Sequence, residues 1–507
     1  MRLHIFITLF FLNFSLCIYS EEEQIQISPF EKLENKFKSD EKKLAQKWHG
    51  SDSTEREIIK NSLKDLYEKW HNIRHYKAFK EILHNFNYSK EKITVLYPAS
   101  GAHIAPFEIF HNGNFKEVNF IFTEIDVKVI PKLEILLQEM QKEGSYKNLS
   151  SKIFPLENLK YYKIPPPTVI SSQDIIKNWV EKTINETGEA PPLKVIFSFE
   201  YKKSIVNLHL IFKGNVIENG ITDYYRPEDF EKADLLISHD LSFDPRENLA
   251  LLKTFIDSAC ILNKNKIFVL IEDLENYPQP LDLSLFNIVK RTNKPYGHSS
   301  YFKLPDGNIL ETEGDFSLYE GAVLLEPNLE LFCKLNNYER NTIFNLILFK
   351  DYAFYRKNYD LIDGKKIPAP ILLDYYIGFG YKDIEKNDIR KKNDFLLELS
   401  KQSIKILKNN KNSSLNNWLC FSLQKFKNNM QKIIDNKEKF SNKNFEKNNI
   451  SNLFLISEKT KKTYKKALQS EKEIEKKLEN DKIEIKKALS FLNSIDFETN
   501  LCRRNKN

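Results

Sequence analysis

The chain has 507 residues, a formal net charge of +7 and five cysteines. This length is enough for two or three domains of about 100–200 residues each. The cysteines are widely spaced, with no Cys-x-x-Cys pair and no zinc-type spacing to histidines, so the sequence indicates neither a metal knuckle nor a disulfide-dense scaffold. Cys260 lies in an apolar helical pattern and is predicted to be a core residue. The cysteine pattern permits an oxidising compartment without requiring one.

Residues 1–20 have the pattern of a signal peptide. A basic start at Arg2 is followed by an apolar run and then by glutamates, with small Ser20 before the expected cut. The apolar run is short for a bilayer, which needs about 20 residues. Export to the periplasm, the cell surface or the medium is therefore expected, with a retained membrane anchor as the alternative. No later stretch is long enough and free enough of charge to predict a transmembrane span.

Residues 21–90 are expected to form a helical N-terminal segment. Apolar residues recur there with helical spacing over 31–86, and Thr54 is a candidate cap. From residue 91 to 330 the pattern changes to buried strands separated by helices. Strands are predicted near 93–99, 118–126, 193–201, 205–215, 233–243 and 266–274, helices near 131–143 and 246–262, and a late hairpin from 299–311 and 317–327. This alternation predicts an α/β fold with a doubly wound, mostly parallel Rossmann-like sheet.

Beyond residue 330 the strand signals fade. A connector is expected over 331–380, followed by a basic helical tail over 381–507, where 30 Lys and Arg stand against 17 Asp and Glu. The last helix, about 456–493, is expected to be either a short coiled-coil seam or a helix docked on the body. Its stripe consists of Ile474, Leu478, Ile485, Ala488 and Leu492.

The basic tail permits several partners. Nucleic acid, an anionic lipid or an acidic protein would all be attracted, while surface tolerance of Lys and Asn is the simpler explanation. Lysines without interleaved aromatic residues lack stacking platforms for bases. Weak, salt-sensitive attraction to polyanions is therefore predicted, with no sequence-specific nucleic-acid binding.

The stretch VLYPASGAH, residues 95–103, is the strongest candidate for a ligand-binding turn. In open parallel sheets, ligands bind beyond the carboxyl ends of the strands where the strand order reverses. Small residues let the backbone approach a ligand, and an acidic residue about 20 positions later is placed to bind ribose hydroxyls. Glu124 and Asp126, in FTEID, occupy that position.

These segments resemble class I S-adenosylmethionine-dependent methyltransferases over roughly residues 90–330. Aligned on VLYPASGAH, Tyr97 stands where the family usually has an acid, and Ala99 replaces the first glycine. Gly101 keeps the second glycine, and His103 stands at the third. The resemblance implies these four residues as cofactor-binding positions and S-adenosylmethionine as the cofactor, although three departures in one motif favour a chain without cofactor.

The resemblance also assigns roles beyond the turn. Glu124 or Asp126 would hold the ribose, and His239 and Asp240, in LLISHDLSF, would face the methyl acceptor as a general base pair. Each assignment has an alternative: Gly101 supplies a positive φ in a tight turn, the acidic residues cap the next segment, and His239–Asp240 is a polar strand end.

Two functions follow as hypotheses. The first is an exported protein with a degenerate methyltransferase-like fold, which acts as a binding or structural module for a protein or surface partner. The second is a methyltransferase that acts on an unidentified acceptor. Because a fold does not decide function, the site must distinguish them. The export signal and the missing glycines favour the first.

Overall fold

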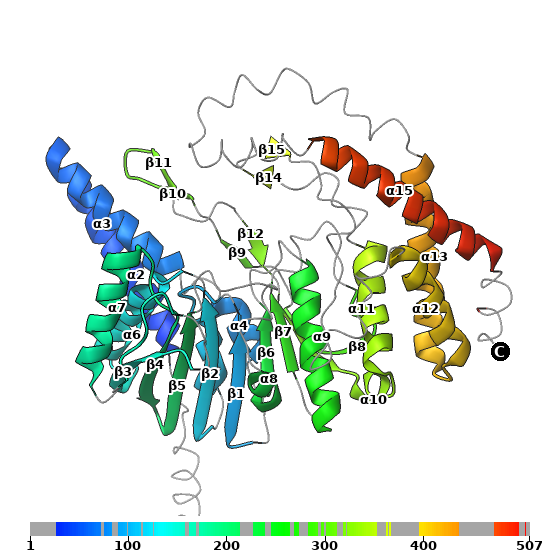
Figure 1. The fold of residues 1–507 in the computed structure, drawn as a ribbon. Coiled ribbons are helices and arrows are strands. Elements are labelled where there is room, and N and C mark those ends of the chain that lie inside the picture. Colours follow the sequence, from blue (N-terminus) through cyan, green and yellow to red (C-terminus); the bar gives the residue numbers. More distant parts are fainter. Residues whose placement is uncertain are drawn as a thin grey trace, which may run out of the picture.

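The computed structural model describes most of the chain as a mixed α/β protein (Figure 1). The described residues are 27–71, 76–83, 90–98, 100–112, 115–124, 126–157, 162–168, 172–212, 227–238, 245–263, 268–272, 282–292, 296–298, 301–311, 318–320, 322–351, 361–362, 365–366, 395–435, 471–495 and 502. The expected signal peptide at 1–20 lies outside them. No helix within these ranges combines the length and apolar character needed to cross a membrane.

The centre of the fold is a nine-stranded sheet with the order β3-β4-β5-β2-β1-β6-β7-β13-β8. Its strands are β1 (Lys92–Tyr97), β2 (Glu117–Glu124), β3 (Lys147–Pro155), β4 (Leu193–Tyr201), β5 (Ser204–Phe212), β6 (Leu235–Ser238), β7 (Phe268–Glu272), β8 (Phe286–Arg291) and β13 (Ala322–Pro327). The five strands from β5 to β7 are parallel. The pairs β3–β4, β4–β5, β7–β13 and β13–β8 are antiparallel.

Helices cover both faces of this sheet. Successive strand residues point to opposite faces, and on β1 Val95 and Tyr97 join one apolar cluster while Leu96 joins another. We call the cluster with Val95 the N-face core, because α2 (Pro29–Trp48), α4 (Tyr76–Leu83), α5 (Glu108–Asn112) and α6 (Val129–Lys142) contribute to it. The cluster with Leu96 is the C-face core. The helices after β1 and β2 thus lie opposite those that flank β6.

The N-terminal segment is helical, as expected. The helix α2 begins with a capping box: the Ser28 hydroxyl accepts from the Phe30 N–H, and Glu31 accepts from the Ser28 N–H. The next helix is α3 (Ser53–His71). The prediction of Thr54 as its cap was wrong, because the Asp52 carboxylate accepts from the backbone N–H groups of Thr54 and Glu55, each at 2.9 Å. A short acidic side chain two residues earlier reaches these donors directly.

The expected late hairpin is wrong in its pairing, because the described residues of its two segments pair with other strands. Residues 301–311 fold back on themselves as β10 (Tyr301–Lys303) and β11 (Ile309–Glu311), which lie beside α3 in Figure 1. The second segment gives β12 (Leu318–Glu320), paired with β9 (Tyr296–His298), and then β13 in the main sheet. The apolar run of β13 is long enough to be buried on both faces, so it enters the sheet between β7 and β8.

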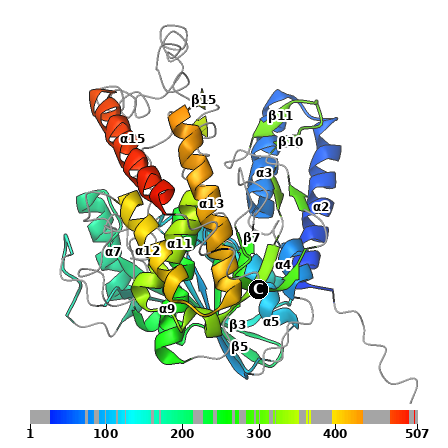
Figure 2. The ribbon, with the colours of Figure 1, turned by 90° about the vertical axis from the view of Figure 1, so that its right-hand side faces the viewer.

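The remaining helices pack on the C-face. Here α8 (Pro227–Lys232) and α9 (Pro245–Leu262) are joined by α10 (Leu329–Phe332), α11 (Asn337–Asp351), α12 (Phe395–Asn409), α13 (Ser413–Asp435) and α15 (Glu471–Ser494). Figure 2 shows α12, α13 and α15 beside α11. The helix α15 is docked on α12 and α13, the second of its two predicted arrangements, with Ile485, Ala488 and Leu492 buried. The side chains of Ile474 and Leu478 lie outside the described part. Elsewhere α7 (Gln173–Thr187) packs on β3, and β14 (Leu361–Ile362) pairs with β15 (Lys365–Lys366).

Two disulfides join residues far apart in the sequence. Cys260 of α9 bonds Cys333 after α10, and Cys420 of α13 bonds Cys502, with sequence separations of 73 and 82 residues. The prediction of Cys260 as a plain core residue was therefore incomplete. It packs partly buried against the C-face core and is also oxidised. Because the bonded cysteines are so far apart in the sequence, no local motif predicts their pairing.

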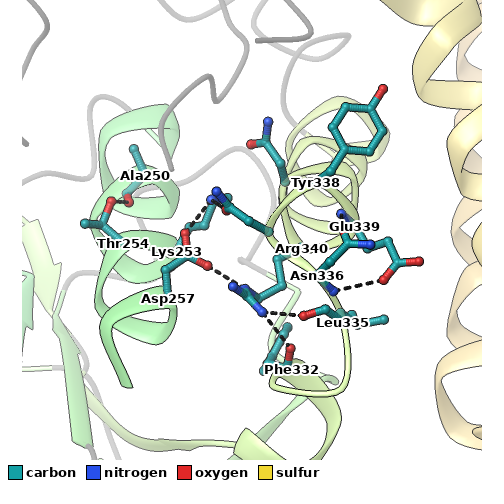
Figure 3. A network of polar contacts seen from close by, with 12 residues as sticks. Ala250, Lys253, Thr254, Asp257, Phe332, Leu335, Asn336, Tyr338, Glu339 and Arg340 are labelled. Carbon is teal, nitrogen blue, oxygen red and sulfur yellow. Dashed lines mark hydrogen bonds and ion pairs between the residues drawn. The ribbon is translucent and has the colours of Figure 1, made fainter. Parts of the chain in front are cut away.

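A buried ionic network fastens α9 to α10 and α11 (Figure 3). Asp257 accepts from Lys253 Nζ at 2.6 Å and from Arg340 Nε at 2.5 Å, and the Lys253 and Asp257 side chains are at most 1% exposed. The Arg340 guanidinium also donates to the backbone oxygens of Phe332 and Leu335. Burial lowers the pKa of Lys253, while the Asp257 carboxylate opposes that shift. One carboxylate thus pairs with two cations, and the network joins α9 to α10 and α11.

Candidate functional site

Parallel pairing places the turn after β1 beside the end of β2. The register pairs Tyr97 with Phe122, so Ser100 and Gly101 lie against Thr123 and Glu124. The Ser100 N–H donates to the Thr123 oxygen at 3.1 Å, and the His103 N–H donates to the Ser100 oxygen at 3.3 Å. The short η1 (Ala105–Phe107) and α5 follow. The predicted placement of the turn, with an acidic residue beside it, is confirmed.

Gly101 is required by the conformation of this turn. Its φ is +55°, in the left-handed region that glycine adopts without strain. A Cβ atom there would also lie 2.9 Å from Cδ2 of the His103 ring. The ring of His103 therefore occupies the space directly beside the glycine. The sequence left two roles open for Gly101, cofactor binding and a positive φ in a tight turn, and the structure displays the positive φ.

Glu124 is held inward by the backbone of the same turn. Its side chain accepts from the Gly101 N–H at 2.8 Å through Oε2 and from the Asp126 N–H at 3.1 Å through Oε1. The residue is only 8% exposed. Both carboxylate oxygens thus stabilise the chain itself, because each accepts a charge-assisted bond from a backbone donor. A carboxylate in this position ties β1 to β2.

The other predicted cofactor residues serve the fold in similar ways. Tyr97 is fully buried in the N-face core, edge-on to Phe122 with ring centroids 4.9 Å apart. Asp126 is exposed, and its carboxylate accepts from the Lys128 N–H at 2.9 Å, in the turn before α6. Ala99 lies outside the described residues. His239 and Asp240 also lie outside them, immediately after Ser238 at the end of β6.

A second polar cluster, which the sequence did not suggest, lies within the N-face core. Glu108 of α5 is fully buried and accepts from the Ser28 hydroxyl at 2.7 Å. Burial raises the pKa of the Glu108 carboxyl to about 7. Burial also lowers the pKa of His111, one turn later, to about 4, and its Nδ1 is hydrogen-bonded to the Tyr201 hydroxyl. The partners come from residues 28, 108 and 201, so no sequence motif joins them.

Two of the cavities on the described part of the molecule are lined by polar side chains. One of about 190 Å³ lies beside Tyr201 and is lined by Lys32, Lys147 and Lys202 among others. The other, of about 630 Å³, lies between the start of β8 and α13. Neither is lined by residues 98–103. Within the described ranges, no group of three or more His, Cys, Asp or Glu side chains is arranged to hold a metal ion.

Comparison with known proteins adds no relative to this description. No protein-family model matches the chain, and no curated protein matches it.

Proposed function

We propose that this chain is an exported, non-catalytic binding protein built on a methyltransferase-like α/β domain. The observation that carries the proposal is the state of the turn after β1. Glu124, the residue expected to bind ribose, uses both oxygens on backbone N–H groups, and the His103 ring lies against Gly101. The chain's own side chains thus make the contacts that a cofactor would need.

The sheet supports a doubly wound, Rossmann-like arrangement as the scaffold. Numbered by their order along the chain, the parallel strands β5-β2-β1-β6-β7 read 3-2-1-4-5, the order of dinucleotide-binding folds up to that point. The strand order reverses at β1, between β2 and β6, where a ligand turn belongs in such folds. The antiparallel β13, which comes from the second segment of the expected late hairpin, lies between β7 and β8.

Export is supported by the oxidation state of the cysteines. The four cysteines after residue 20 form the two disulfides, and the fifth, Cys17, belongs to the predicted signal peptide. Disulfides persist in secreted and periplasmic proteins and are rare where thiols are kept reduced. A compartment without a supply of S-adenosylmethionine removes the need for the family's glycines.

The alternative, a methyltransferase, keeps one specific observation in its favour. The strand order and the acidic residue at the end of β2 stand where that family needs them. For an enzyme, however, Glu124 would have to exchange two backbone donors for ribose hydroxyls when the cofactor binds. Because the carboxylate is already satisfied, this exchange gains little free energy.

Equilibrium dialysis of the full oxidised chain against radiolabelled S-adenosylmethionine tests the proposal. We expect no retention of label above a protein without such a fold, at cofactor concentrations up to the millimolar range. Retention at micromolar cofactor, in a one-to-one ratio, would overturn the non-catalytic reading. Mass spectrometry of the native protein tests export separately: a mature N-terminus near residue 21 is expected, and an intact Met1 would contradict it.

A further inference from the structure

The larger cavity lies at the opposite end of the sheet from the turn after β1. β13 is antiparallel to β7, so its last residues lie at the amino ends of the parallel strands. There Pro327 pairs with Phe286, the first residue of β8, and Phe286 lines the cavity. The helices α11 and α13 close the other side through Lys350 and Trp418. This site is therefore separate from any cofactor site at residues 98–103.

The floor of the cavity is an ordered polar assembly. Asp282 accepts from the Trp418 Nε1–H at 2.9 Å, from the Ser284 N–H at 3.0 Å and from the ammonium of Lys350. Although burial opposes ionisation, the Lys350 ammonium lowers the pKa of Asp282 to about 2. Asn429 donates to the Lys350 oxygen at 2.7 Å. The carboxylate thus stays charged and fixes the indole and the ammonium before any ligand arrives.

Aromatic rings form one wall. Lys350 Nζ lies 4.9 Å from the centroid of the Trp418 ring and 5.7 Å from that of Phe421. Phe421 is 64% exposed although its side chain is large and apolar, whereas other apolar residues of α13 are buried. Lys425 follows four residues later on α13 and also lines the cavity. Residues at this spacing lie next to each other on a helix surface.

The rest of the lining is rich in hydrogen-bonding groups. Amide and hydroxyl side chains come from Ser284, Asn287, Asn328 and Ser414. The charged side chains of the lining are those of Asp282, Lys350 and Lys425, so two of the three are cations. A volume of about 630 Å³ lies within the range typical of small-molecule sites, about 300–1,000 Å³.

We propose that this cavity binds an acidic sugar, such as a uronic acid unit of an anionic glycan. The inference rests on the proposed binding function and gives it a site and a ligand class. A sugar ring has an apolar C–H face, and those hydrogens are attracted to the negative face of an aromatic ring such as that of Phe421. Its hydroxyls suit the amide and hydroxyl side chains, and its carboxylate suits the Lys425 ammonium.

Other ligand classes fit less well. A cationic ligand would meet the Lys350 ammonium above both rings, so the aromatic wall favours an anion or a neutral group. A neutral apolar ligand would leave the amide and hydroxyl groups of the lining without partners, at a loss of affinity.

The test is a titration of the full oxidised chain with a glucuronate-containing disaccharide, followed by calorimetry or ligand-observed NMR. Phe421→Ala should weaken binding by about tenfold, equivalent to about 1.4 kcal/mol. Lys425→Gln should weaken it by a smaller factor and reduce its dependence on salt. Two exposed positions outside the cavity serve as controls: Ile483→Ala on α15 and Lys432→Gln on α13 should leave binding unchanged.

Three results would overturn the inference. The first is no binding of the disaccharide at about 10 mM, a concentration beyond the millimolar dissociation constants of weak specific sites. The second is equal affinity of Phe421→Ala and the wild-type chain for the disaccharide. The third is competition by acetate that equals competition by the disaccharide. Failure here is distinguishable from failure of the proposed function. The dialysis with S-adenosylmethionine reports on the opposite end of the sheet, and its outcome does not depend on Phe421 or Lys425.

Discussion

At the scale of single residues, two buried carboxylates differ in their hydrogen-bond partners. Glu124 accepts two backbone N–H bonds, whereas Glu108 has the Ser28 hydroxyl in a region surrounded by apolar side chains. Burial disfavours the charged form of Glu108, although the Ser28 hydrogen bond and the Lys80 ammonium oppose that effect. Ionisation of Glu108 should therefore affect folding stability near neutral pH.

Glu108→Gln should flatten the dependence of stability on pH. The folded-state pKa of Glu108 is raised from 4.5 to about 7, so the folded state binds more protons between these values. Stability from this group is present below pH 4.5 and is lost as the pH rises through 7. Denaturant unfolding at pH 5 and pH 8 should show a larger loss for the wild-type chain than for the variant. Equal changes in the two proteins would refute the assignment.

At the scale of elements, the helices α9, α10 and α11 are joined by more than apolar packing. The Cys260–Cys333 disulfide and the Lys253–Asp257–Arg340 network both cross from α9 to the segment that follows β13. The exposed Lys334–Glu330 ion pair lies on the same segment, with side chains 68% and 84% exposed. The region therefore offers a buried and an exposed carboxylate for direct comparison.

Asp257→Asn should lower the free energy of unfolding by about 3–5 kcal/mol, since it leaves the buried Lys253 and Arg340 charges without their counter-ion. Glu330→Gln, the same chemical change at the exposed pair, should produce a far smaller loss because water already screens that pair. Urea unfolding of both variants measures the difference. Similar losses at the two positions would show that the buried network contributes nothing specific.

The sequence predicted those elements whose pattern is local. Continuous apolar runs identified β1, β2, β4, β5, β6 and β7, and the helical period identified α6 and α9. By contrast, β3 was missed because most of its residues are exposed and polar, and β8 because only Phe286 at its start is buried. The inward turn of Glu124 was also missed, since its bond to Gly101 spans 23 residues. The division of the chain into domains stays a prediction.

At the scale of the whole molecule, the C-terminal helices share a core with the sheet. Residues 342–350 of α11 are all buried, so this helix is enclosed on every side. A helix that is apolar all round needs neighbours on all sides, and α9, α12 and α13 provide them. The Cys420–Cys502 disulfide also ties the end of the chain to α13. If the basic tail folded apart from the sheet, limited proteolysis would leave a stable fragment ending near 330–400. These contacts argue against such a separable tail.

A chain that ends at Asp351 should therefore fail to fold cooperatively. Removal of α12, α13 and α15 exposes the outer side of α11, and the lost burial amounts to several side chains at about 1.5–3 kcal/mol each. Soluble expression and circular dichroism during thermal unfolding would measure the effect. A soluble fragment with a sharp unfolding transition would establish the separable tail instead.

The free energy of unfolding of the wild-type chain and of Glu124→Gln, each with and without S-adenosylmethionine, tests the central claim most directly. If Glu124 is structural, the variant loses about 1–3 kcal/mol, because an amide replaces one acceptor of a buried backbone N–H. Added cofactor then leaves the free energy of unfolding of both proteins unchanged. If Glu124 holds ribose, the cofactor at a hundredfold excess over its Kd stabilises the wild-type chain by about 2.7 kcal/mol. That gain in the wild-type chain, absent from the variant, would contradict the non-catalytic binding function.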